Sequence, residues 1–175
     1  DDLGADNYLL QNEQGFSSQQ LYRYRTEGHN TFTINNNSDF NQLANQFVTI
    51  DQSVQNESSA YMVADTSDIY SDIKSMQMGY YIGNNKSTLK MRAEMIPSQD
   101  SEIYWFMHTR AQIDILNHTA YLTQNGKRIK LEFLCSDPQA EISVMEAKPL
   151  ESSGITNYGT VNSQYRKIAI RFNAK

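Results

Sequence analysis

The sequence predicts an all-β protein, an antiparallel β-sandwich preceded by an irregular N-terminal leader. Asn125-Gly126 stands between alternating apolar and polar residues, and both tolerate a positive φ, which is typical of a tight β-hairpin turn. Residues 89–95 alternate strictly between apolar and charged side chains, which indicates a strand with one face buried. Strand patterns recur about every ten residues with no long amphipathic helix between them, which favours a sandwich.

The first thirty residues lack a clear period and are rich in Gln and Asn. We expect a leader there with at most one short helix, over residues 17–24, and a first short strand over 31–35. The expected strands that follow are residues 47–52, 60–65, 74–82, 89–95, 103–109, the two arms of the hairpin, 141–146 and 167–172.

Two strands carry specific expectations about burial. Residues 103–108 place large side chains on both faces and include the only Trp, which predicts a strand covered on both sides. After the hairpin turn, Ile129, Leu131 and Phe133 alternate with charged residues, which predicts one apolar face.

Composition limits the classes of function. A chain of 175 residues fits one domain, and its formal net charge of −5 argues against nucleic acid or an anionic membrane surface as a partner. No apolar run approaches the roughly 20 residues needed to insert across a bilayer. Cys135 has no second cysteine to pair with, and a buried structural thiol is its expected state. The start at Asp1 rather than Met suggests a piece of a longer protein.

Candidate chemistry is concentrated in one polar cluster, formed by Arg25, Glu27, His29 and Asn30 before the first strand. Such donors and acceptors can hold a metal, a sugar or a neighbouring domain, and they can equally well satisfy backbone groups at the start of a strand. His108 follows an aromatic run and is expected to be packed, while His118 is expected in a turn.

Two further features leave alternatives open. Tyr80-Tyr81 and residues 104–106 can stack on sugar rings or fill the core. A zinc site would need His29, a carboxylate such as Asp51 and a second His or Cys, yet none occurs between Asn30 and Met107. The chain has no phosphate loop, no Cys-x-x-Cys and no Gly-x-Ser-x-Gly motif.

Five ordered motifs together resemble the C-terminal part of heparinase II/III-like polysaccharide lyases. In that family a helical toroid carries most of the catalytic groups, and a C-terminal sandwich of supersandwich type completes the cleft. The resemblance therefore implies a leader at residues 1–30 from an absent N-terminal catalytic domain, and a sandwich at 31–175. The motifs are Asp-Leu-Gly-Ala-Asp-Asn-Tyr at 2–8, Tyr-Arg-Tyr-Arg-Thr-Glu-Gly-His-Asn-Thr at 22–31, Tyr-Trp-Phe-Met-His-Thr at 104–109, Leu-Thr-Gln-Asn-Gly-Lys at 122–127 and Val-Met-Glu-Ala at 144–147.

The resemblance implies β-elimination on an acidic, uronate-containing polysaccharide, with the reactive groups mainly on the toroid. Arg25, Glu27, His29 and Asn30 would then border the cleft or the domain interface. His29 and Asp51 match positions that hold a structural zinc in some members, but Gln77-Met78 stands where a second His is expected. Glu27 occupies a position at which some members carry a catalytic His. Such lyases are periplasmic or secreted.

Three hypotheses follow. The first is a non-catalytic sandwich that is inactive without its toroid partner. The second is a carbohydrate-binding or assembly module without lyase activity. The third is a structural domain without a ligand.

Overall fold

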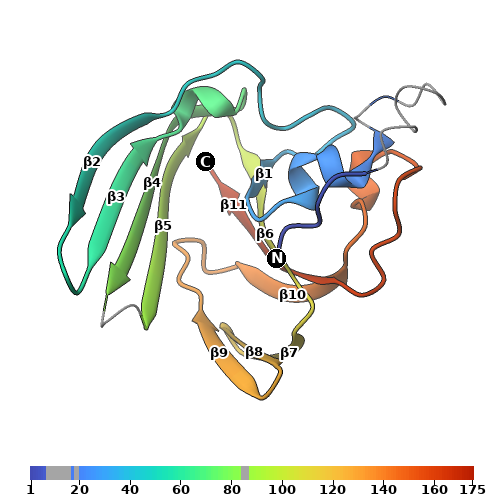
Figure 1. Cartoon of the computed structure of the whole chain (residues 1–175). Coiled ribbons are helices and arrows are strands. Elements are labelled where there is room, and N and C mark those ends of the chain that lie inside the picture. The colour runs from blue at the N-terminus through green and yellow to red at the C-terminus, as the bar shows by residue number, and fades with distance from the viewer. Residues whose placement is uncertain (7–16, 18–19, 84–86) are drawn as a thin grey trace. The chain divides into compact units, whose positions relative to one another are not determined.

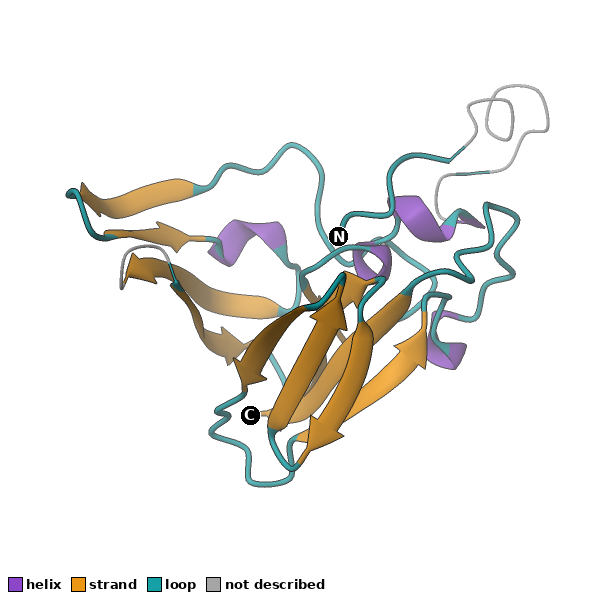
Figure 2. Cartoon of the chain, turned by 60° about the horizontal axis from the view of Figure 1, so that its bottom comes forward, coloured by secondary structure: helices purple, strands orange, loops and turns teal. Residues whose placement is uncertain are grey.

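A computed structural model describes residues 1–6, 17, 20–83 and 87–175. Strands dominate the described chain, and its helices are single 3-10 turns (Figure 2). The strands are β1 (Phe32–Ile34), β2 (Thr49–Gln55), β3 (Ala60–Asp65), β4 (Ile73–Gly83), β5 (Thr88–Pro97), β6 (Ser101–Thr109), β7 (Gln112–Leu116), β8 (Thr119–Gln124), β9 (Lys127–Glu132), β10 (Glu141–Glu146) and β11 (Arg166–Ala174). The 3-10 turns are η2 (Tyr22–Tyr24), η3 (Thr26–Gly28), η4 (Ser67–Ile69) and η5 (Glu151–Ser153). No helix in these ranges is long and apolar enough to cross a membrane.

The predicted fold class is confirmed: the chain is all-β and antiparallel, in keeping with a sandwich. It divides into two compact units, residues 1–41 with 102–174, and residues 42–101 with 175. The first unit holds sheets ordered β1-β6-β11-β10 and β7-β8-β9, and the second holds the sheet β2-β3-β4-β5 (Figure 1).

The two sheets of the first unit share a core. Ala111, Ala120, Leu122 and Ile168 are buried together, with partly buried side chains from β6, β7, β9 and β10 against them. The hairpin prediction is confirmed, because β8 and β9 pair antiparallel around Asn125 (φ 51°) and Gly126 (φ 72°). The alternation predicted for β9 is met only in part, since Leu131 and Phe133 reach this core while Ile129 is exposed.

The described part of the expected leader belongs to this first unit. Leu3 and Tyr22 are buried with Ala147 and Tyr165 in a second apolar cluster. The chain passes from one unit to the other after residue 41 and again after residue 101, so the expected domain boundary at residue 30 matches neither point. The predicted helix at 17–24 is observed only as the turn η2, and residues 18 and 19 lie outside the described residues.

The second unit is a four-stranded antiparallel meander, drawn in blue-green to yellow-green in Figure 1. Register pairing places Met62, Tyr80 and Met91 on one apolar face, together with Ala64, Met78 and Ala93. We expected β5 to bury one face, and this was wrong at the start of the strand: Leu89 is 70% exposed and Met91 is exposed, while Ala93 and Met95 are half-buried. Alternation specifies which face of a strand is apolar, but it carries no information about how much of that face is covered.

Three other expectations can be compared with the structure. Cys135 is exposed, which corrects the expectation of a buried thiol, because it lies in a loop after β9 rather than in a strand. The strand β7 was missed, although Ile113 and Ile115 alternate with polar residues. Residues on both faces of β6 are buried or half-buried, as predicted.

Candidate functional site

Two consecutive 3-10 turns, η2 and η3, position the predicted polar cluster. The backbone N–H of Arg25 donates to the Tyr22 carbonyl, and the N–H of His29 donates to the Thr26 carbonyl. Gly28 lies against η2 so closely that a Cβ there would be 2.2 Å from the Tyr22 carbonyl oxygen. Only glycine permits this approach, and Arg25 and Glu27 are buried next to it.

Arg25 and Glu27 form a buried ion pair with a Nε to Oε1 distance of 2.7 Å. Glu27 also accepts hydrogen bonds from Ser153 Oγ at 2.6 Å and from the Leu150 N–H at 2.8 Å. Arg25 Nη1 donates to the Ser38 carbonyl oxygen at 2.9 Å. With three donors on its oxygens, this carboxylate is a structural acceptor rather than a base.

His108 lies at the centre of a second buried group. Its backbone N–H donates to Asn30 Oδ1 at 2.7 Å, and its Nδ1 lies 3.3 Å from the same oxygen. Because that oxygen can only accept, we assign the ring proton to Nδ1. The Tyr22 hydroxyl, which has one proton, lies 2.8 Å from the other ring nitrogen, Nε2, and 3.1 Å from the Glu27 carbonyl oxygen. With the ring proton on Nδ1, Nε2 is an acceptor for this hydroxyl.

Lys167 completes this group from β11. Its Nζ donates to the Tyr22 hydroxyl at 3.1 Å and to the Lys148 carbonyl at 2.8 Å, and it lies 4.5 Å from the centroid of the Phe106 ring. Burial lowers the pKa of Lys167 to about 8, partly opposed by the charge of Glu27.

The pKa values of the two neighbours of Lys167 shift for the same reason. Burial and the positive charge of Lys167 lower the pKa of His108 to about 3, while burial raises the pKa of Tyr22. His108 is therefore neutral and Tyr22 keeps its proton at neutral pH. Since both side chains are buried, neither can act as a base on an external substrate.

His29 and Asn30 lie at the surface above this buried group. His29 Nδ1 is 3.3 Å from Asp2 Oδ2, and both side chains are largely open to solvent. The Gly4 N–H and then His29 lower the pKa of Asp2. Of the four predicted residues, His29 and Asn30 are thus available to a ligand or a neighbouring domain, whereas Arg25 and Glu27 hold the local fold.

The predicted metal ligands belong to different units, His29 to the first and Asp51 to the second. Asp51, on β2 in the second unit, accepts a hydrogen bond from Gln77 Nε2 at 3.4 Å. The two side chains thus meet where the resemblance implies a carboxylate and a second ligand. However, an amide is not a zinc ligand of the usual N/S set, and the described residues contain no group of three His, Cys, Asp or Glu able to hold a metal. These residues do not fit zinc.

The motifs behind the resemblance converge in the first unit. Tyr22 and Asn30 from the second motif contact His108 from the third, and the Asp1 amino group next to the first motif donates to the His108 carbonyl at 2.7 Å. Ala147 of the fifth motif packs in one apolar cluster with Leu3 and Tyr22. Segments more than a hundred residues apart therefore meet at one place. Asn7 and Tyr8 of the first motif lie outside the described residues.

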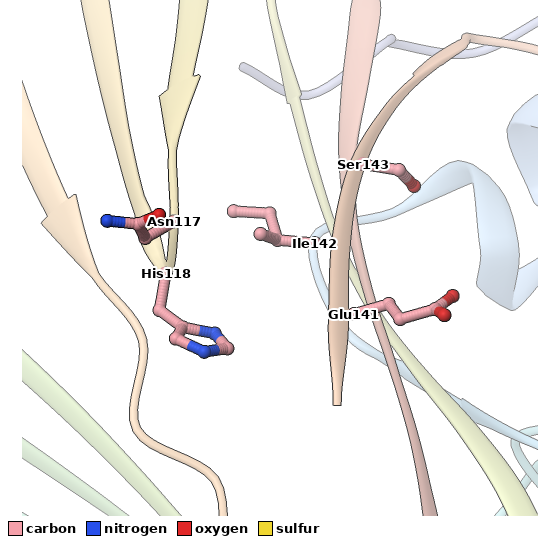
Figure 3. A pocket seen from close by; sticks show the side chains of 5 residues that line it. All are labelled: Asn117, His118, Glu141, Ile142 and Ser143. Atoms are coloured by element: carbon pink, nitrogen blue, oxygen red, sulfur yellow. The ribbon is translucent and has the colours of Figure 1, made fainter. Parts of the chain in front are cut away.

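A shallow hollow of about 630 Å³ lies elsewhere in the first unit, between the β7–β8 turn and the start of β10. Figure 3 shows Ile142 pointing into it toward Asn117 and His118, while Glu141 and Ser143 point to the other side of the strand. His118 lies in the turn, as expected. None of the predicted site residues lines this hollow.

Sequence reasoning missed three buried side chains: Tyr22 and Lys167, which lie beside His108, and Ser153, which lies beside Glu27. Lys167 had a signal: it directly precedes the apolar run 168–170 in its strand. Ser153 had none, because it reaches Glu27 across 126 positions of sequence.

Comparison with known proteins adds no identification. No family model matches this chain, and no curated protein matches it either.

Proposed function

We propose that this chain is the C-terminal, non-catalytic β-sandwich part of a heparinase II/III-like polysaccharide lyase. The observation that carries the proposal is the convergence of four of the five resembling motifs around His108 and Tyr22. An accidental resemblance of scattered short motifs gives no reason for them to meet in space. The expected environment is the periplasm or the outside of the cell.

The reaction proposed for the parent protein is β-elimination of a uronate polysaccharide. A base removes the proton α to the carboxyl group, the developing enolate is stabilised, and the glycosidic oxygen leaves with a proton. This chain's buried groups do not supply that base, because Glu27 is fully hydrogen-bonded and His108 and Tyr22 are enclosed. The base and most of the cleft are therefore assigned to an N-terminal helical toroid.

His29 and Asn30 are the residues that would reach the cleft or the domain interface. Asn30 accepts a hydrogen bond from the His108 N–H, and His29 lies 3.3 Å from Asp2, so both side chains have a polar partner at the surface. In this division of labour the buried ion pair and the His108 group stabilise the conformation of the segment that carries His29 and Asn30. The neighbouring domain or the polysaccharide would contact that segment.

The test compares the 175-residue chain with its full-length parent. Both are incubated with uronate polysaccharides of several kinds, and the ultraviolet absorbance of the unsaturated product is followed. We expect product only from the parent. Product from the isolated chain would overturn the division of labour, and no product from the parent on any uronate polymer would overturn the lyase assignment.

A second candidate function is a carbohydrate-binding or assembly module without lyase activity. The half-exposed Tyr61 and Tyr81, which lie side by side on one sheet face, favour this alternative. Binding of polysaccharide by a parent that forms no product would select it.

A further inference from the structure

The second unit carries an aromatic and cationic row that the buried group of the first unit does not involve. Register pairs run from Val54 to Tyr61, from Tyr61 to Tyr81, and from Tyr81 to Lys90, so that one row crosses all four strands. Residues directly opposite one another in antiparallel strands share a face, and neighbouring strands lie about 4.8 Å apart. The row is therefore about 14 Å long, which is enough for a short oligosaccharide.

The two tyrosines of this row present ring surface to solvent. Tyr61 is 39% exposed and Tyr81 is 37% exposed. The Tyr81 ring lies along β4 over Gly83, where a Cβ would come 2.2 to 2.5 Å from its Oη, Cζ and Cε1 atoms. The missing side chain at Gly83 thus makes the room in which the ring lies against the strand.

Positive charge lies at one end of the row. Lys90 Nζ is 5.8 Å from the centroid of the Tyr81 ring, and Arg92, two residues along β5, is on the same face and pairs with Glu94. The same face also carries Asp51 and Asp65, which lie beside Gln77, four residues before Tyr81 on β4. Anionic groups of a ligand are therefore drawn to the Lys90 end and kept from the Asp51 end.

We propose that this face, the row Val54, Tyr61, Tyr81 and Lys90 with Arg92 beside it, binds a carboxylate-bearing polysaccharide. The apolar faces of sugar rings stack on the two tyrosines, while a uronate carboxylate pairs with Lys90. The class of ligand rests on the proposed function, but binding by this face does not require that the parent be a lyase. The sheet would hold the polymer on its own.

The test is calorimetric titration of the 175-residue chain with oligogalacturonate and oligomannuronate, with a neutral cello-oligosaccharide as the comparison. We expect at least one acidic oligosaccharide to bind and the neutral one to bind at least tenfold more weakly. Tyr81→Ala should weaken binding about tenfold, the size of effect that follows loss of an aromatic anchor. Lys90→Ala should weaken binding of the acidic ligand, and added salt should reduce the difference between Lys90→Ala and the unaltered chain.

Two variants keep the test sharp. Tyr80→Ala is the matched control, because Tyr80 is equally exposed, at 38%, but lies on the opposite face of the same strand. Gly83→Ala displaces the Tyr81 ring without deleting it and should weaken binding as Tyr81→Ala does. The proposal is overturned if no acidic oligosaccharide binds, if the neutral one binds equally well, or if Tyr80→Ala matches Tyr81→Ala. Any of these results leaves the lyase test on the parent protein unaffected.

Discussion

Glu27 links two parts of the first unit that are far apart in sequence. Its carboxylate accepts from Arg25, Ser153 and the Leu150 N–H, so it joins the first turn of the chain to the segment before β11. Breaking a buried ion pair lowers the free energy of unfolding by more than the intact pair contributed, because the remaining charge stays out of water without a partner.

We expect Glu27→Gln to destabilise the first unit by about 3–5 kcal/mol, because it removes the charge that pairs with buried Arg25. Glu94→Gln is the matched control, since it removes an exposed pair with Arg92 that contributes about 0–1 kcal/mol. Urea unfolding measures both changes. Equal losses in the two variants would contradict the structural role given to Glu27.

Stability should fall in acid because of His108. Its pKa is about 3 in the folded chain against 6.5 for an ordinary histidine, so below pH 6.5 the unfolded chain binds a proton that the folded chain refuses. The free energy of unfolding should drop by up to about 1.4 kcal/mol per pH unit between those values. His108→Gln should remove this slope in urea titrations at several pH values, and an unchanged slope would show that His108 is not its source.

At the level of elements, the alternation of apolar and polar residues predicted the strands well. It predicted less well which residues cover each strand face. The bounds expected for β3 and β10, residues 60–65 and 141–146, are those observed, and Asn125-Gly126 forms the expected turn. The coverage of β5 and the reach of Ser153 to Glu27 depend on residues distant in sequence. No local period contains that information, so the contact between Ser153 and Glu27 was not predictable.

The contact between η2 and η3 should depend on the absence of a side chain at Gly28. Gly28→Ala should destabilise the chain by roughly 1–3 kcal/mol, since its Cβ would overlap the Tyr22 carbonyl. Gly79→Ala is the comparison: its Cβ would meet Arg92 only at 3.9 Å, and alanine is favoured over glycine within a strand by about 0.5–1 kcal/mol. Thermal unfolding should therefore shift in opposite directions, and a shared direction would contradict the packing described for Gly28.

At the level of the whole molecule, charge and exposed apolar surface should act together. The sequence pI is about 5.1, and Leu89 and Ile50 lie exposed on the apolar face of the second unit. We expect self-association, measured by light scattering, to peak near pH 5, where net charge no longer keeps molecules apart. Leu89→Glu should reduce it.

Val161→Glu is the control for that experiment, because it adds the same charge at an exposed apolar residue of the first unit. If both variants suppress scattering equally, charge alone explains the association and the apolar face has no part in it.

The burial of Lys167 and of neutral His108 affects the pH of the solution in which the chain folds. Both groups hold a proton less tightly in the native state than an ordinary lysine or histidine does. Refolding in lightly buffered water should therefore acidify the solution, through His108 between pH 3 and 6.5 and through Lys167 from about pH 8 upward to 10. A dye that reports hydrogen-ion release would record the assembly of this interior as it happens.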